Sequence, residues 1–166
     1  MEQFDILNRD GSHTGRTANK GTKLQNCQYY LGTHAYVYNS KIEFLLQKRA
    51  YSKSFQPGTW DICAEHTVAG ETSVDCVRRG LQEELGLAVA EVGVPTRQMW
   101  DEHNHTVDVY FIKHDFKLDK LTLQAEEVAE AKTATRTEML ALIEQMHFRP
   151  AEYRDAMREK IENLDF

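Results

Sequence analysis

Two adjacent glutamates, Glu83 and Glu84, are the residues of this chain whose type and spacing best suit chemistry. They follow Gly80 and precede Gly86, in a stretch whose apolar residues recur at helical spacing. Position 80 lies one turn before both glutamates, so an acid there would complete a cluster of carboxylates. Such clusters hold Mg²⁺ or Mn²⁺, ions that polarise phosphate groups and activate water. Spacing alone favours a pair of solvated charges on an exposed helix face.

The elements that must position these glutamates are a strand, a tight loop and a helix. Residues 60–68 look extended, residues 69–71 form a turn, and Thr72 is the expected N-cap of a helix that ends at Gly86. Further elements are predicted from apolar periodicity and turn residues. They are strands over 4–7, 31–38, 43–48, 89–99, 106–114 and 128–134, a polar loop over 12–28, and helices over 135–146 and 150–163. This mixture predicts an α/β or α+β domain with a mixed sheet covered by helices.

The composition is that of a globular domain, with 41% hydrophobic and 28% charged residues in a chain of 166, a length that favours a single domain. The net charge of −6 argues against a general binder of nucleic acid or of anionic membranes. It permits a phosphorylated substrate, because a divalent metal supplies local positive charge. The chain lacks a long apolar stretch, signal-peptide features and a CxxC motif, so a cytoplasmic protein with reduced thiols is predicted.

The segment 65–87 resembles the box of the Nudix superfamily, G-x5-E-x7-R-E-U-x-E-E-x-G-U, in which U is a bulky aliphatic residue. Seven of the nine fixed positions match, namely Glu71, Arg79, Leu81, Glu83, Glu84, Gly86 and Leu87. The flanks at 44–49 and 126–130 are similar to the family as well, so the resemblance runs from about residue 30 to about residue 145. It implies a single Nudix domain over residues 1–166, folded as an α/β/α sandwich with a mixed β-sheet.

The resemblance implies metal-dependent hydrolysis of a diphosphate-containing small molecule, such as a nucleoside diphosphate derivative. In that interpretation Glu83 and Glu84 hold Mg²⁺ or Mn²⁺ and serve as catalytic residues. Glu127 is the third catalytic candidate, as a general base that reaches the site from a loop, although an exposed acidic residue is an equally good interpretation. The predicted partner is the diphosphate substrate, with no nucleic-acid polymer and no membrane, and a homodimer is compatible with the family.

Other residues have supporting roles under the same resemblance. Lys48 and Arg49, at the end of a predicted strand, are the candidate substrate-binding residues, because paired basic side chains there would contact a diphosphate. Glu71, Arg79 and Gly86 are structural members of the box, with Arg79 expected to pair with a box carboxylate.

Gly80 and Glu65 are the two positions at which the chain departs from the box pattern. Typical members have a metal-binding glutamate at the first and a glycine at the second. Since glycine inside a helix costs about 1 kcal/mol relative to alanine, Gly80 needs a reason. Three stay open: close approach of the backbone to another group, a substitute acid, or loss of metal catalysis. Glu65, Asp75 and Glu127 are the candidate substitutes, of which Glu65 is interpreted as a tolerated surface change and Asp75 as a solvated residue.

Gly80 also supports an alternative of another class, a catalytically weak Nudix domain that binds a phosphorylated ligand or partner. A third interpretation is isopentenyl-diphosphate isomerase, whose branch the first residues resemble. That enzyme needs a cysteine just before the histidine that His66 would represent, and Cys63 is displaced from this position. Isomerase activity is therefore rejected, and Cys63 is interpreted as a core residue. The segment 103–105, His-Asn-His, is expected to form an exposed hairpin loop rather than a metal site.

Overall fold

A seven-stranded mixed sheet forms the centre of the computed structural model, which describes residues 1–165. Its long central pair is parallel, with β3 and β8 in register from Tyr30↔His105 to Tyr38↔Lys113, and the other pairings are antiparallel. β4 pairs with β5 and β9, while β6 lies along the first half of β3. The strands are β3 (Tyr30–Tyr38), β4 (Phe44–Arg49), β5 (Trp60–Asp61), β6 (Cys63–His66), β7 (Thr96–Trp100), β8 (His105–Lys113) and β9 (Val128–Ala134).

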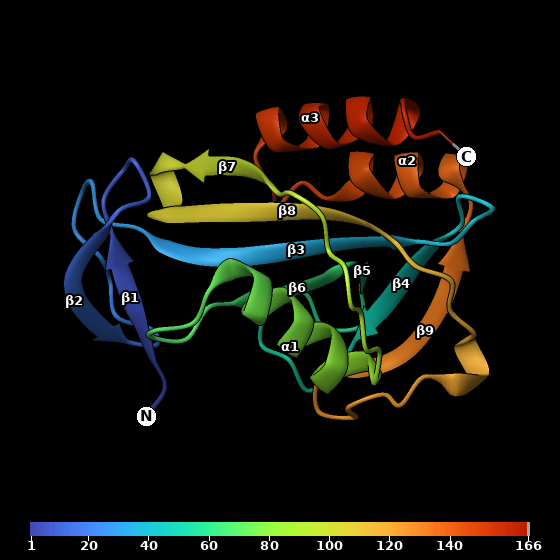
Figure 1. Ribbon diagram of the computed structural model, residues 1–166, viewed down its shortest axis with the longest axis horizontal. Helices are drawn as coiled ribbons and strands as arrows, with labels where there is room; N and C mark the ends of the chain where they lie inside the picture. Colours follow the sequence, from blue (N-terminus) through green and yellow to red (C-terminus); the bar gives the residue numbers. More distant parts are fainter. Residues whose placement is uncertain (166) are drawn as a thin grey trace.

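Helices cover both faces of this sheet, α1 (Ser73–Leu85) on one and α2 (Arg136–Gln145) with α3 (Ala151–Glu162) on the other (Figure 1). Each face has its own apolar core, because successive side chains of a strand point to opposite faces. The α1 side buries Ala35, Leu45, Cys63, Val77 and Leu81, and the α2–α3 side buries Tyr36, Phe44, Leu46, Met139 and Met157. The predicted fold class, a mixed sheet between helices, is confirmed.

The helix boundaries follow their capping residues, as the sequence predicts. Thr72 accepts a hydrogen bond at its hydroxyl from the Asp75 backbone N–H, and Gly86 ends α1 in the left-handed conformation at φ 64°. Thr135 and Glu138 form a reciprocal capping box at the start of α2. None of the helices within residues 1–165 is long and apolar enough to cross a membrane.

Two predictions of strands and loops are wrong. Residues 12–28 contain a strand, β2 (His13–Asn19), which pairs antiparallel with β1 (Gln3–Leu7) as a ribbon at the end of the sheet. Most side chains of β2 are exposed, so it carries no apolar alternation to reveal it. The strand predicted over 89–99 begins only at Thr96, because Gly93 adopts φ 74° and Pro95 cannot donate to a ladder. Two single turns of 3-10 helix, η1 (Asp101–His103) and η2 (Leu118–Lys120), complete the order.

Candidate active site

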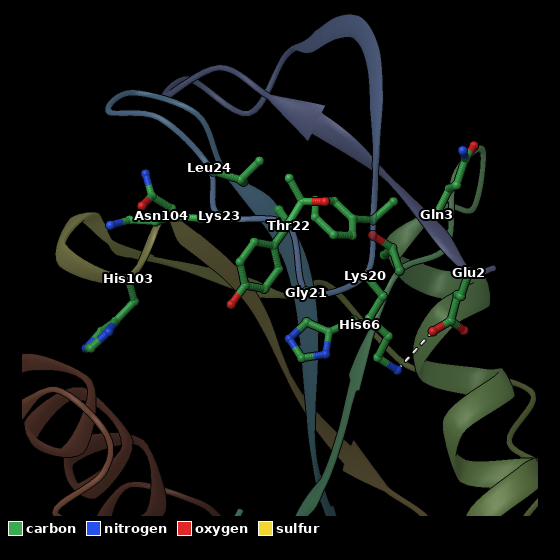
Figure 2. A pocket seen from close by; sticks show the side chains of 13 residues that line it. Glu2, Gln3, Lys20, Gly21, Thr22, Lys23, Leu24, His66, His103 and Asn104 are labelled. Atoms are coloured by element: carbon green, nitrogen blue, oxygen red, sulfur yellow. Dashed lines mark ion pairs between the residues drawn. The ribbon is translucent and has the colours of Figure 1, made fainter.

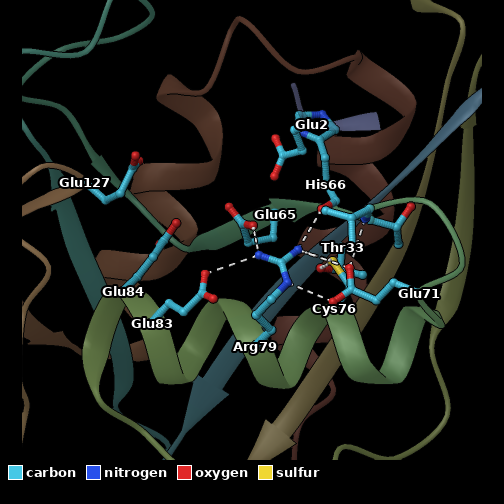
Figure 3. Close-up of polar contacts among 12 residues, drawn as sticks. Glu2, Thr33, Glu65, His66, Glu71, Cys76, Arg79, Glu83, Glu84 and Glu127 are labelled. Carbon is cyan, nitrogen blue, oxygen red and sulfur yellow. Dashed lines mark hydrogen bonds and ion pairs between the residues drawn. The ribbon is translucent and has the colours of Figure 1, made fainter. Parts of the chain in front are cut away.

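The end of α1 brings the predicted metal ligands beside two other carboxylates. Glu83 and Glu84 lie in the last turn of α1, Glu65 projects from β6, and Glu127 precedes β9. Figure 3 shows the four side chains extending from these three elements into one region above the helix. The sequence placed Glu83 and Glu84 together, whereas only the packing of β6 and β9 against α1 and β4 brings Glu65 and Glu127 to them.

Glu84 is the buried member of this group, with 5% of its surface exposed. Its Oε2 accepts a 2.6 Å hydrogen bond from Gln47 Nε2, while Gln47 Oε1 is buried and has no hydrogen-bond partner among the described residues. Burial, and to a smaller extent the charges of Glu65 and Glu127, raise the pKa of Glu84 to about 7 against that hydrogen bond. Negative charge is therefore in excess here, next to a buried amide oxygen that still lacks a donor or a cation.

Gly80 and Glu65 occupy the same space. A Cβ added to Gly80 would lie 2.5 Å from Cγ and 3.3 Å from Cβ of Glu65. The backbone of Gly80 is helical, so its conformation does not require a glycine. The close contact with Glu65 is what requires it. Glu65 is 27% exposed at its side chain, and its burial raises its pKa against the ion pair with Arg79. The interpretation of Glu65 as a tolerated surface change is wrong, because its side chain packs onto α1.

Arg79 is the one guanidinium of α1 that faces these carboxylates. It forms a bidentate pair with Glu71, with Nε–Oε1 at 2.8 Å and Nη2–Oε2 at 3.1 Å. Its Nη1 lies 2.7 Å from Glu65 Oε2 and 3.3 Å from Glu83 Oε2, and Nη2 donates to the carbonyl of His66. Arg79 therefore ties the loop before α1 to the helix and also restrains two of the carboxylates (Figure 3).

The predicted substrate-binding residues, Lys48 and Arg49, are not brought to the carboxylates. Gln47 points to the α1 face, so Lys48 points to the opposite face, where its Nζ lies 2.8 Å from Glu130 Oε1. Arg49 Nε donates to the carbonyl oxygen of Phe55 at 2.9 Å. Their role in binding substrate stays a prediction that no contact supports.

A different cation, Lys53, lies at the site. It follows β4 in a turn, and its Nζ is 2.5 Å from Oε2 of Glu127. Sequence reasoning missed it because it stands in a polar loop without a spacing that relates it to Glu127. Asp75, another candidate substitute acid, is exposed and bonded to the cap residue Thr72.

A cavity of about 330 Å³ opens between the β1–β2 ribbon and the end of the sheet (Figure 2). Its walls include the aromatic rings of Phe4, Tyr30 and His66 and the amines of Lys20 and Lys23. His66 directly follows Glu65 on β6, so the two side chains point to opposite faces of the sheet, and none of the four carboxylates lines the cavity. The link between them is Lys20, a lining residue whose charge reaches Glu65.

The prediction of an exposed loop for residues 103–105 is wrong in its last residue. His105 begins β8 and is 8% exposed, with its ring stacked on Tyr30 at 4.4 Å between centroids and 5.1 Å from His66. It supports the aromatic wall of the cavity from behind. Gly32 makes room for it, because a Cβ there would lie 2.5 Å from His105 Nε2.

The residues at the end of α1 fit a hard divalent cation, although they do not form a ready-made cage. Within residues 1–165, no three His, Cys, Asp or Glu side chains converge as a metal-binding group. Glu65 and Glu83 turn toward Arg79, and Glu84 turns toward Gln47. The fit comes from the donor chemistry, which is all oxygen, and from the unpartnered Oε1 of Gln47. A bound cation would stabilise the ionised form of Glu84, whose pKa is raised mainly by burial and then by the charges of Glu65 and Glu127.

Cys63 gives no support to isomerase chemistry. Its thiol is buried, donates to Glu84 Oε2 at 3.6 Å, and does not line the cavity beside His66. Burial raises its pKa well above the usual range. The thiol and the acid are thus neighbours within the packed interior and do not face each other across a pocket.

Comparisons with known proteins agree with this geometry. A family model described as the NUDIX domain matches residues 29–157. The chain is 36% identical over 151 residues to an uncharacterized Nudix hydrolase, lmo0368, of Listeria monocytogenes, covering 90% of this chain and 89% of that protein. It is 33% identical over 93 residues to isopentenyl-diphosphate Delta-isomerase of Saccharopolyspora erythraea, covering 55% of this chain and 48% of the isomerase.

Solved structures share the fold at low sequence identity. The crystal structure of DR0079 from Deinococcus radiodurans superposes with a TM-score of 0.75 at 18% identity, covering 95% of this chain and 98% of that one. The NUDIX domain of NrtR from Shewanella oneidensis, solved with ADP ribose, has a TM-score of 0.60 at 17% identity, covering 87% of this chain and 93% of that one. These matches confirm the expected Nudix-type α/β/α sandwich.

Proposed function

This chain belongs to the Nudix family, and we propose that it hydrolyses a diphosphate-containing small molecule with the help of Mg²⁺ or Mn²⁺. The observation that carries the proposal is the buried Glu84, which has carboxylates around it and an amide oxygen of Gln47 without a partner beside it. Burying unbalanced negative charge is unfavourable for folding, so such a group is expected where a cation binds.

Each residue then has a distinct task. Glu83 and Glu84 would hold the cation, which when bound neutralises charge on the diphosphate oxygens and acidifies water. Gln47 fixes Glu84 through the 2.6 Å hydrogen bond. Glu127, held by Lys53, would accept the proton of the attacking water as general base. Arg79 positions the loop before α1 through its pair with Glu71.

The cavity beside His66 favours a nucleoside-linked diphosphate. The rings of Phe4, Tyr30 and His66 offer faces on which a nucleobase can stack, and the amines of Lys20 and Lys23 match a phosphate group. The NrtR domain that shares this fold was solved with ADP ribose, a molecule of that class. We infer that the diphosphate lies over the carboxylates and that the substrate passes around β6, which pairs only with β3, so that the nucleoside enters the cavity.

The test is a turnover screen of the purified protein with Mg²⁺ or Mn²⁺. The panel contains nucleoside diphosphate sugars, dinucleotide coenzymes, coenzyme A and prenyl diphosphates, with Glu84→Gln as the loss-of-charge variant and Glu130→Gln as the matched control on the opposite face. Hydrolysis in water labelled with ¹⁸O, read by mass spectrometry, shows which phosphorus atom is attacked. The proposal expects turnover by the wild type and by Glu130→Gln, and almost none by Glu84→Gln.

The screen also separates the alternatives. A ligand that raises the melting temperature of the wild type without being turned over would replace hydrolysis by the binding-module interpretation, since a ligand specific to the folded state must stabilise it. Conversion of isopentenyl diphosphate without release of phosphate would restore the isomerase. Turnover that persists in Glu84→Gln would place catalysis elsewhere.

A further inference from the structure

We propose that Glu65 and Gly80 are an exchanged pair, in which Glu65 delivers from β6 the third carboxylate of the divalent-cation site, into the space that a side chain at position 80 would fill. The proposal rests on the proposed function for the presence of a cation site at the end of α1. It goes beyond that function by naming a ligand from a different element of the fold, in place of the helix residue.

The first observation is steric. The side chain of Glu65 lies where a Cβ on Gly80 would stand, at 2.5 Å from Cγ and 3.3 Å from Cβ. A glutamate at position 80 and the present Glu65 therefore exclude each other, and one carboxylate can reach this point from the helix or from the strand. In this chain the carboxylate comes from the strand, and position 80 of the helix is therefore a glycine.

The second observation is the direction of the carboxylate. Glu65 extends over α1 into the region where Glu83 and Glu84 also point, and Arg79 bridges Glu65 and Glu83 through a single nitrogen, Nη1 (Figure 3). These two carboxylates therefore approach one cationic atom in this structure, and a divalent cation can take the same two donors.

The third observation points to a ligand independently of Glu65. Gln47 is 5% exposed and its Nε2 is bonded to Glu84, yet its Oε1 has no partner among the described residues. An unpartnered buried amide oxygen beside this cluster is what a cation or its bound water would satisfy. The two positions at which the chain departs from the box pattern are thus in contact with each other, at the edge of a site that is short of positive charge.

The test measures Mn²⁺ binding without substrate, from the free Mn²⁺ signal in electron paramagnetic resonance. Glu65→Gln keeps the packing onto α1 and removes the charge, and it is expected to weaken Mn²⁺ binding at least about tenfold. Glu130→Gln, on the opposite face, is the matched control and is expected to bind as the wild type does. The double variant Glu65→Gly with Gly80→Glu returns the carboxylate to the helix and is expected to recover most of the lost affinity.

A steric readout accompanies the binding assay. Gly80→Ala gains helix propensity but meets Glu65 in the wild type, whereas in the Glu65→Gly background Cys63 Sγ remains at 3.5 Å, an ordinary contact. The melting temperature should therefore rise more on Gly80→Ala in that background than in the wild type. Equal shifts in the two backgrounds would show that the contact has no energetic weight and would overturn the exchanged pair.

The outcomes separate this inference from the function on which it rests. If Glu65→Gln binds Mn²⁺ as tightly as the wild type while Glu84→Gln does not, the third carboxylate is not Glu65 and the hydrolase proposal survives. If the wild type binds no Mn²⁺ and turns over no substrate, both proposals fail. If the double variant folds and binds no better than Glu65→Gln, the two positions do not exchange and the inference fails alone.

Discussion

Two buried polar clusters lie on opposite faces of the same sheet, and they are built differently. On the α2–α3 face, Arg149 and Asp61 form an ion pair at 2.8 Å, with side chains 4% and 6% exposed. Asp61 also accepts from the backbone N–H of Ile62, so both charges are matched. On the α1 face, Glu84 is buried among carboxylates beside the unpartnered Oε1 of Gln47.

The neighbours of the ion pair extend this contrast. The Tyr153 hydroxyl bonds to His34 Nδ1 at 2.7 Å and to the Tyr36 hydroxyl at 2.8 Å. A buried network whose charges and hydroxyls are all paired stabilises one arrangement of the fold. A buried cluster with an excess of negative charge is instead suited to bind a cation. Burial of a polar residue therefore does not by itself indicate its role. Whether its charge and hydrogen bonds are matched by partners distinguishes a structural cluster from a binding site.

The largest expected effect comes from breaking the matched cluster. Arg149→Met leaves the carboxylate of Asp61 buried without its cation, which should lower the free energy of unfolding by about 3–5 kcal/mol. Urea unfolding followed by circular dichroism measures it. The double variant with Asp61→Asn should regain part of the loss, because no unpaired charge remains. A loss below about 1 kcal/mol would mean that water reaches Asp61 and that this cluster is not closed.

Neutralising Glu84, in contrast to Arg149→Met, should impair catalysis without lowering stability. Glu84→Gln is expected to lower kcat at least about 100-fold, while metal-free stability at pH 7 stays equal or rises because a buried carboxylate has been neutralised. Steady-state kinetics and thermal unfolding of the same preparation make the comparison. A strongly destabilised Glu84→Gln would show that Glu84 holds the fold together and would remove the contrast between the two faces.

The pH dependence of stability sharpens the comparison further. Burial, together with the positive charge of Arg149, lowers the pKa of His34 well below its usual value of 6.5, so the folded state keeps this ring neutral. Below pH 6.5 the unfolded chain binds a proton at His34 that the folded chain does not bind. Stability from this group is therefore complete above that pH and falls by up to about 1.4 kcal/mol per pH unit as the pH drops.

His34→Gln provides the control, because its amide can still bond to the Tyr153 hydroxyl but does not titrate. Chemical unfolding at a series of pH values should show a shallower acid slope for this variant than for the wild type. Equal slopes would mean that the ring of His34 accepts its proton in the folded state.

The smallest expected effect concerns one hydroxyl of the paired network. Tyr36→Phe removes the 2.8 Å bond to Tyr153 but leaves the Tyr153 hydroxyl bonded to His34. Because no buried group loses its last partner, the loss in unfolding free energy should be about 0.5–1.5 kcal/mol by urea titration. Tyr153→Phe, which strips His34 and Tyr36 of their common partner, should be more destabilising, and an equal effect would contradict the network.

The elements that local interactions control could be predicted from the sequence. Thr72 and Gly86 bound α1 through capping bonds and a left-handed residue, and the spacing of Glu83 and Glu84 sets them on one turn whatever surrounds them. The spaced pattern from Glu71 to Leu87 was long enough to indicate the family, and the apolar periods of the central strands were long enough to predict the mixed sheet.

Which side chains meet depends on the tertiary fold. The contact of Glu65 with Gly80, the pairing of Lys53 with Glu127 and the burial of His105 depend on how strands distant in sequence lie against one another. The same holds for Lys48 of β4, because one position along a strand reverses the face to which a side chain points. Composition and spacing carry no record of these contacts, since they arise from the register of the sheet and the seating of α1 upon it.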